Sequence, residues 1–225
     1  MCRVSVIEFF IYHLRKKEFE GKRVLEVGSK YVNGSVRPLI KRWCAPLEYI
    51  GVDLEPGKFV DVVLPAEKLI KYFGRESFDV VISTETLEHV KDWRFVINNM
   101  KQVLKPGGYM YITTCSRGFP YHNFPYDFWR YELEDMKEIF SDFEILVLTK
   151  NHEEQGIFLK ARKPKHYAPK RLDNLALYSM VLGRRTKRIV DLQEMPLVRK
   201  LKFTGWKICL NVIQAIKNRF IYKRQ

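Results

Sequence analysis

Short apolar segments rich in valine and isoleucine alternate with helix-like segments along the first half of the chain. The clearest are residues 23–28, 49–53 and 78–83. These segments carry few polar residues on either face, which is typical of strands buried on both sides in a parallel sheet. Strands that alternate with helices at this spacing form βαβ units. The sequence therefore predicts an α/β fold built on a doubly wound, mostly parallel sheet.

Seven strands complete the predicted sheet. The first five belong to β/α units, and the last two close the sheet after a helix at about residues 133–140. An earlier helix is expected from Trp93 to Leu104, because Lys105-Pro106-Gly107-Gly108 would end it. A helical stripe is also expected over residues 4–19. The other predicted strands cover residues 60–64, 109–114, 143–149 and 156–161.

The charge of the chain is concentrated at one end. The 225 residues have a formal net charge of +14. Residues 1–160 hold 23 Lys and Arg against 23 Asp and Glu, whereas residues 161–225 hold 17 against 3. The whole excess therefore arises in the second part. We predict a neutral domain over residues 1–163 and a basic, mainly helical C-terminal extension over residues 164–225.

The extension contains an apolar stripe at helical spacing, formed by Trp206, Leu210, Ile213, Ile216 and Phe220. Three interpretations stay open. The stripe could pack on the domain, which is the simplest explanation. A basic amphipathic helix with Trp and Phe also suits an anionic membrane surface, and Lys and Arg interleaved with aromatic residues suit nucleic acid.

Several classes of protein are excluded or disfavoured by what the sequence lacks. The four cysteines are scattered without a CxxC pair, so a disulfide framework and a cysteine zinc site are not expected. No group of residues has metal-ligand spacing, and we expect no metal. No convincing signal peptide or membrane-spanning segment is visible. We expect a cytoplasmic protein, with peripheral membrane contact as one option.

Polar residues follow the predicted strands where a doubly wound sheet binds its ligands. Glycine at position 28 would let backbone N–H groups approach a ligand closely. Asp53 ends the second strand, where a carboxylate can accept hydrogen bonds from both hydroxyls of a ribose. These features fit an adenosine-containing cofactor. The G-x-G-x-x-G dinucleotide fingerprint and the P-loop motif are both absent.

Five segments together resemble the class I S-adenosylmethionine-dependent methyltransferases. They occur in the family's order and spacing across residues 20–115. The segments are Val24-Leu25-Glu26-Val27-Gly28, Gly51-Val52-Asp53, Phe78-Asp79-Val80-Val81, Leu87-Glu88-His89-Val90 and Leu104-Lys105-Pro106-Gly107-Gly108. The resemblance implies a Rossmann-like seven-stranded sheet over residues 1–163 and S-adenosyl-L-methionine as the cofactor.

The resemblance also implies which residues contact the cofactor at its methionine part, its ribose, its adenine and its sulfonium. These residues are Glu26, Gly28, Asp53, Leu54, Ala66, Glu67 and Thr84. The chain departs from the family pattern at two positions. Lys30 stands where the family usually has a second glycine, and Pro65 stands where an acidic residue often contacts the adenine.

An aromatic segment over residues 118–131 follows the fifth strand, so it should overhang the same edge of the sheet. Flat aromatic faces with a few polar groups are typical of a pocket for an organic ligand. The segment resembles the lid of methyltransferases of glycan and cell-envelope synthesis. The acceptor-binding candidates are Tyr121, His122, Asp127, Trp129 and Arg130. A purely structural role is the alternative.

Candidate catalytic residues are groups that could remove a proton from the acceptor: Glu85, His89 and His122. The leading functional hypothesis is methyl transfer to a small molecule or glycan, lipid-linked glycans included. One alternative is an RNA methyltransferase whose extension binds phosphates, although Ser83-Thr84-Glu85-Thr86 lacks an N/D-P-P-Y/F-like motif. The other is a non-catalytic adaptor, and the intact Glu26, Gly28 and Asp53 argue against it. No feature of the sequence predicts an oligomeric state.

Overall fold

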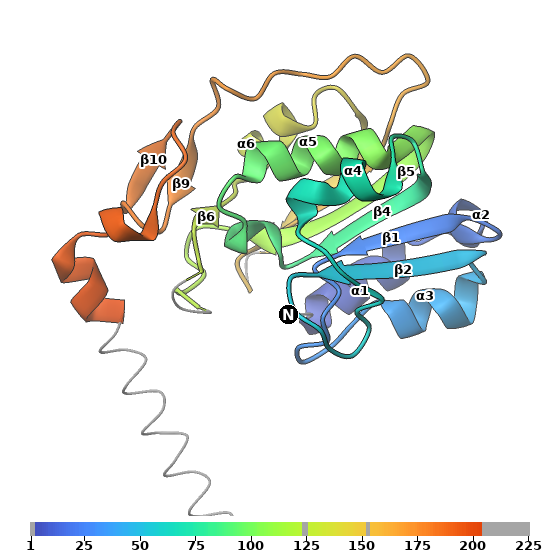
Figure 1. The fold of residues 1–225 in the computed structure, drawn as a ribbon, viewed down its shortest axis with the longest axis horizontal. Coiled ribbons are helices and arrows are strands. Elements are labelled where there is room, and N and C mark those ends of the chain that lie inside the picture. Colours follow the sequence, from blue (N-terminus) through green and yellow to red (C-terminus); the bar gives the residue numbers. More distant parts are fainter. Residues whose placement is uncertain (1–2, 123–125, 152–153, 204–225) are drawn as a thin grey trace, which may run out of the picture.

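The computed structural model describes residues 3–122, 126–151 and 154–203, and its centre is a seven-stranded sheet (Figure 1). The strand order is β3-β2-β1-β4-β5-β8-β7. The strands are β1 (Arg23–Val27), β2 (Glu48–Asp53), β3 (Val62–Val63), β4 (Phe78–Thr84), β5 (Leu104–Cys115), β7 (Glu144–Asn151) and β8 (Gly156–Arg162). The order reverses beside β1, which makes this the switch point of a doubly wound sheet.

The first five strands pair in parallel and the last two pair antiparallel. The central strands are buried on both faces because helices cover the sheet from two sides. This arrangement confirms the predicted fold class. It also brings the carboxyl ends of β1, β2, β4 and β5 to one edge of the sheet.

Helices form two layers against the sheet (Figure 1). One layer packs Val6, Phe10 and Ile40 against Tyr111 of β5. The other packs Trp93, Val96 and Met100 against the opposite face of the sheet. The helices are α1 (Val4–His13), α2 (Lys16–Phe19), α3 (Arg37–Cys44), α4 (Leu69–Phe73), α5 (Trp93–Val103) and α6 (Leu133–Ile139).

Some predicted boundaries were wrong. The stripe over residues 4–19 forms two helices, because the residues at 14 and 15 adopt extended backbone. The third strand is shorter than residues 60–64 and pairs with β2 only at Val62 and Val63. The predicted turn at residues 105–108 lies within β5 as an irregularity, where Gly107 has a φ of +80°. Glycine adopts this left-handed conformation without a steric cost.

The described part of the C-terminal extension shares the core of the domain. β9 (Leu177–Ser179) and β10 (Arg184–Thr186) form a three-stranded sheet with β6 (Trp129–Arg130). Leu177, Val181 and Val190 are buried in the same apolar cluster as α5. Within residues 164–203, the α-helical part is residues 197–203, and several apolar side chains pack in the core of the domain. The predicted boundary at residue 163 and the helical structure of the extension as a whole stay predictions.

The apolar stripe from Trp206 to Phe220 lies outside the described residues. Its predicted helical structure and its partner therefore stay predictions. Among the described residues, no helix has the length and hydropathy needed to cross a membrane.

Candidate active site

The first part of the site lies at the end of β1. Glu26 is 2% exposed, and Tyr49 donates a hydrogen bond from its hydroxyl to Glu26 Oε2 at 2.8 Å. Burial raises the pKa of Glu26 to about 7, although the Tyr49 hydroxyl and the Arg37 guanidinium oppose this shift. Glu26 is therefore poised to ionise when a cationic group comes close to it.

The turn after β1 requires glycine. Gly28 has a φ of +80°, and a Cβ atom built there would lie 2.0 Å from Thr86 Oγ1. Its N–H donates to the carbonyl of Val52 at 2.9 Å. The turn therefore brings the loops after β1 and β4 into direct contact, and no side chain fits between them.

Asp53 at the end of β2 organises the loops on either side of it. Its Oδ2 accepts a hydrogen bond from the backbone N–H of Lys30 at 3.0 Å, and its Oδ1 accepts one from Leu54 at 2.8 Å. The Leu54 side chain is 68% exposed. Oδ1 also accepts a longer contact of 3.5 Å from the Glu55 N–H, so Oδ2 keeps the further lone pair that can accept a ligand hydroxyl.

A short 3₁₀ helix, η1 (Ala66–Lys68), follows β3 at the same edge. Asn99 of α5 donates from Nδ2 to the carbonyls of Ala66 and Glu67, at 3.2 and 2.9 Å. Pro65 precedes this turn in an extended conformation. The two predicted adenine contacts are thus held by the helix behind them, and the Glu67 side chain itself is exposed.

Two buried carboxylates follow β4. Thr84 is the last residue of the strand and is buried, and Glu85 next to it has a φ of +50°. A non-glycine residue in this conformation is uncommon, and such strain is often found at functional sites. Glu85 Oε2 forms a 2.8 Å ion pair with Arg3. Burial and the nearby Glu88 raise the pKa of Glu85 to about 7.

Glu88 lies at the centre of a group of polar side chains and is fully buried. It is the middle residue of the 3₁₀ helix η2 (Leu87–His89), and Thr114 of β5 donates to its Oε2 at 2.8 Å. Burial alone would raise the pKa of Glu88, but His89, His122 and the Thr114 hydroxyl outweigh it and lower the pKa.

The two candidate histidines come together beside Glu88. Their rings pack edge to face with centroids 4.7 Å apart. Nδ1 of His89 lies 2.5 Å from the carbonyl oxygen of Tyr126, and Nδ1 of His122 lies 3.1 Å from Asp127 Oδ2. The structure therefore gathers Glu85, His89 and His122, the predicted catalytic candidates, around one residue that was not predicted.

Asp127 and Arg130 support this group from the interior. Arg130 donates to both oxygens of Asp127 at 2.5 and 2.7 Å, and the side chains are 1% and 0% exposed. Burial alone would raise the pKa of Asp127, but the hydrogen bonds from Arg130 and His122 outweigh it and lower the pKa. A charged Asp127 thus fixes the ring of His122.

The remaining candidates for acceptor binding differ in exposure. Trp129 is fully buried, and its Nε1 donates to the carbonyls of Val90 and Lys91. In this conformation neither Trp129 nor Arg130 is open to an acceptor. Tyr121 is partly buried and stacks on Phe203, with ring centroids 4.0 Å apart. Of the five acceptor-binding candidates, Tyr121 and His122 are the two that are not fully buried.

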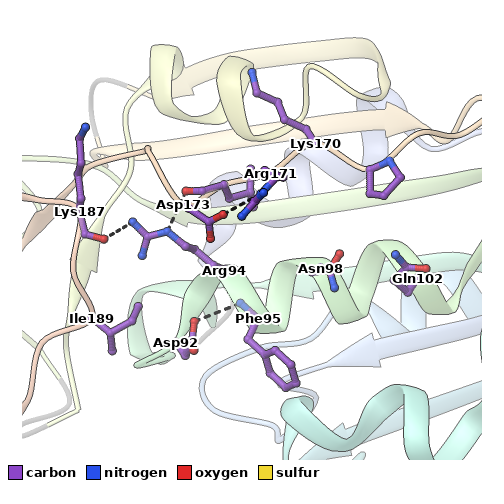
Figure 2. Close-up of a pocket in the computed structure, with 12 residues that line it drawn as sticks. Asp92, Arg94, Phe95, Asn98, Gln102, Lys170, Arg171, Asp173, Lys187 and Ile189 are labelled. Atoms are coloured by element: carbon purple, nitrogen blue, oxygen red, sulfur yellow. Dashed lines mark hydrogen bonds and ion pairs between the residues drawn. The ribbon is translucent and has the colours of Figure 1, made fainter.

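A separate cleft of about 680 Å³ lies along the outer face of α5 (Figure 2). Its lining includes Arg94 and Phe95 of α5 and residues 169–173 of the segment after β8. Arg94 fixes that segment by donating to the carbonyls of Leu172, Leu175 and Lys187. None of the predicted site residues lines this cleft, and its Arg94 has a structural role.

Sequence reasoning missed two residues of the site, Glu88 and Arg3. Glu88 was visible in the Leu87-Glu88-His89-Val90 segment, where an acidic residue between apolar neighbours is a signal of a buried carboxylate. Arg3 is paired with Glu85 across 82 positions of the chain, and also lies over the ring of Phe119. No local pattern indicates such a contact.

Comparison with known proteins identifies the family. The methyltransferase domain family matches residues 6–150. The chain therefore belongs to this family, and the predicted relationship to the class I S-adenosylmethionine-dependent methyltransferases is confirmed.

The curated relatives match this chain over only part of their own length. A ubiquinone biosynthesis O-methyltransferase of Vibrio atlanticus is 33% identical over 118 residues, which are 48% of this chain and 50% of that protein. A second protein with this name, from Chelativorans, is 28% identical over 45% of this chain and 43% of its own length. The chain thus spans about half the length of the curated relatives it matches.

Solved structures share the fold. A 1,6-didemethyltoxoflavin-N1-methyltransferase of Burkholderia thailandensis, solved with S-adenosylhomocysteine bound, superposes with a TM-score of 0.56 at 15% identity. The match covers 72% of this chain and 77% of that one. An S-adenosylmethionine-dependent methyltransferase of Mesorhizobium loti has a TM-score of 0.51 at 17% identity, over 69% and 96% of the two chains.

Proposed function

We propose that this protein transfers the methyl group of S-adenosylmethionine to a hydroxyl oxygen of a small-molecule acceptor. The observation that carries the proposal is the group of buried carboxyl groups and partly exposed imidazoles at the edge of the sheet. Glu85, Glu88, His89 and His122 can take up or hold the proton that a hydroxyl loses. Family membership and the printed names of the O-methyltransferase relatives support it.

The residues after β1 and β2 fit the cofactor. Gly28 allows the tight turn that packs against Thr86, Glu26 offers a carboxylate to an α-ammonium group, and Asp53 keeps a lone pair for a ribose hydroxyl. The bound cofactor supplies an activated methyl group on a sulfonium. The protein then has to align the acceptor oxygen with that methyl group and exclude water.

The direct test is transfer of a radiolabelled methyl group from S-adenosylmethionine into small molecules extracted from cells. Label that is stable to base and recovered in a small organic molecule supports an ether product. Label found only in RNA supports the alternative of an RNA methyltransferase. Binding of S-adenosylhomocysteine without any transfer supports the non-catalytic adaptor. Label recovered in a glycan, in the same experiment, would instead identify a glycan acceptor.

The first prediction concerns the ribose assignment. Asp53→Asn should weaken S-adenosylhomocysteine binding by about 1.5–3 kcal/mol, because it removes charge-assisted hydrogen bonds to the diol. Calorimetric titration measures this loss, which corresponds to roughly 10–150-fold in Kd. Asp173→Asn is the matched control, since its side chain is 67% exposed and pairs only with Arg171 at the surface. Unchanged affinity in Asp53→Asn would remove the ribose assignment.

The second prediction concerns proton release at Glu26. In the free protein the carboxyl is mostly protonated below pH 7. An α-ammonium group beside it would favour the ionised form, so binding should release a proton. Affinity for S-adenosylhomocysteine should therefore rise by up to about tenfold per pH unit below pH 7, and level off above it.

Titrations in two buffers with different ionisation enthalpies measure the proton release at Glu26 directly. Glu26→Gln cannot release this proton, so its affinity should be nearly independent of pH over the same range. An equal pH dependence in both proteins would show that another group releases the proton.

A further inference from the structure

Three side chains at the edge of the sheet face one another through atoms that can bind a metal. They are Glu88, His89 and His122, and their ligand atoms all lie within 4.8 Å of one another. Nε2 of His89 is 4.0 Å from Glu88 Oε1, and Nε2 of His122 is 3.9 Å from the same oxygen. These distances are too long for hydrogen bonds. The three groups therefore converge without hydrogen bonding to one another at these atoms.

The hydrogen bonds on the far side of each ring determine which nitrogen faces that space. Nδ1 of His89 contacts the Tyr126 carbonyl, which can only accept, so Nδ1 carries the proton. Nδ1 of His122 contacts the ionised Asp127 in the same way. In each histidine, Nε2 is then the ring nitrogen that faces Glu88. Glu88 Oε1 also accepts a hydrogen bond from Cys115 Sγ at 3.3 Å.

The supporting side chains match those that surround bound metals. A histidine ligand is usually oriented by a carboxylate or a carbonyl at its other nitrogen, as His122 and His89 are here. Asp127 is itself fixed by Arg130, and Glu88 is fixed by Thr114 at Oε2. Such a shell holds the ligand atoms in place before any ion arrives.

A second buried carboxylate adds an independent observation. Glu85 is 4% exposed, and its Oε1 has no hydrogen-bond partner among the described residues. Glu85 and Glu88 both contact Cys115 Sγ, at 3.6 and 3.3 Å. Arg3 compensates part of the buried negative charge through its 2.8 Å ion pair with Glu85 Oε2, and a second cation near Glu88 would compensate more of it. A positive charge close to Glu88 would stabilise both acidic groups.

We propose that Glu88, His89 and His122 bind one divalent transition-metal cation. Two imidazoles and one carboxylate are donors that suit Zn²⁺, Mn²⁺, Fe²⁺ and Co²⁺, and they leave open positions for a substrate. Ligand atoms on a tetrahedral zinc ion are about 3.4 Å apart, as follows from bond lengths of about 2.0–2.1 Å. The two distances between the histidines and Glu88 therefore have to shorten by about 0.5 Å when the ion binds.

The chemistry of this site rests on the proposed methyl transfer to a hydroxyl. A hydroxyl bound at an open position of the cation has a lowered pKa and releases its proton to solvent. The oxygen then forms a bond to the methyl carbon. The carbon–sulfur bond breaks and its electron pair stays on sulfur, which leaves a neutral thioether and a methyl ether.

Metal binding is measured on the full chain after treatment with EDTA and dialysis. Zn²⁺ is titrated by calorimetry, and Co²⁺ is titrated by visible absorption, which reports on its ligands. We expect one equivalent to bind. His89→Ala, His122→Ala and the shape-preserving Glu88→Gln should each weaken binding by at least tenfold. His166→Ala is the control, because this histidine is exposed and lies outside the site. Circular dichroism verifies that each variant folds.

The outcomes separate the metal site from the proposed function. Absence of binding, or equal affinity in the wild type and in both histidine variants, would overturn the metal site. S-adenosylhomocysteine binding and labelled methyl transfer are measured on the same preparations. Undiminished transfer in EDTA, without retained metal, would overturn the metal's role but leave the proposed function intact. One equivalent of metal bound at these ligands without any cofactor binding would keep the site and reject the proposed function.

Discussion

Arg130→Met should destabilise the protein by about 3–5 kcal/mol, because it removes the guanidinium that compensates the buried charge of Asp127. Both side chains are essentially inaccessible to water, and the pair is bidentate. Arg130 also donates to the carbonyls of Phe119 and Pro120, which fixes the start of the aromatic segment. The free energy of unfolding from urea titration measures the loss.

Two control variants isolate the charge effect at Arg130. The double variant Arg130→Met/Asp127→Asn removes the uncompensated charge as well, so it should recover part of the stability. Arg171→Met breaks an ion pair of 3.1 Å whose side chains are 92% and 67% exposed, and it should cause no measurable change. If Arg130→Met costs less than about 1 kcal/mol, Asp127 is not held as a buried charge, and its support of His122 fails with it.

The fold was predictable because its signals are local. The strands β1, β2 and β4 coincide with runs of apolar, mostly β-branched residues, and such runs reflect burial on both faces. Gly28 was predictable for a similar reason, since its positive φ and close neighbours exclude any side chain. The end of α5 could be placed to within one residue, at Val103 instead of Leu104.

The candidate site was only partly predictable because its contacts are not local. His89 and His122 are separated by 33 positions, and only the folded chain shows that they meet beside Glu88. Spacing along the sequence therefore indicated no metal ligands. The same limit applies to Arg3 and Glu85, which pair although 82 positions separate them.

The C-terminal extension shows that the distribution of charge along a sequence does not predict which residues pack in the core. The excess of Lys and Arg suggested a boundary at residue 163. Charged side chains remain at the surface, however, while their apolar neighbours enter the core: Leu172, Leu177 and Val190 are all buried. β9 has three residues and its partner β6 has two, which is too short for any periodicity to be visible.

The role of the extension in the core can be measured with a single substitution. Leu177→Ala should destabilise the protein by about 2–5 kcal/mol, because Leu177 is fully buried among residues of the main core and its loss leaves a cavity. β9 is also the central strand of its sheet, so a cavity there weakens the contacts with both β6 and β10. Urea titration again provides the measurement.

Leu197→Ala is the matched control for this experiment. It makes the same chemical change a short distance along the extension, at a side chain that is 70% exposed. Its effect should stay within about 0.5 kcal/mol. If both variants are equally stable, the β9–β10 sheet does not contribute to the core in solution, and residues 164–203 form the separable extension that the charge distribution suggests. If Leu177→Ala alone is destabilised, the core of the methyltransferase domain extends past residue 163 and includes the hairpin.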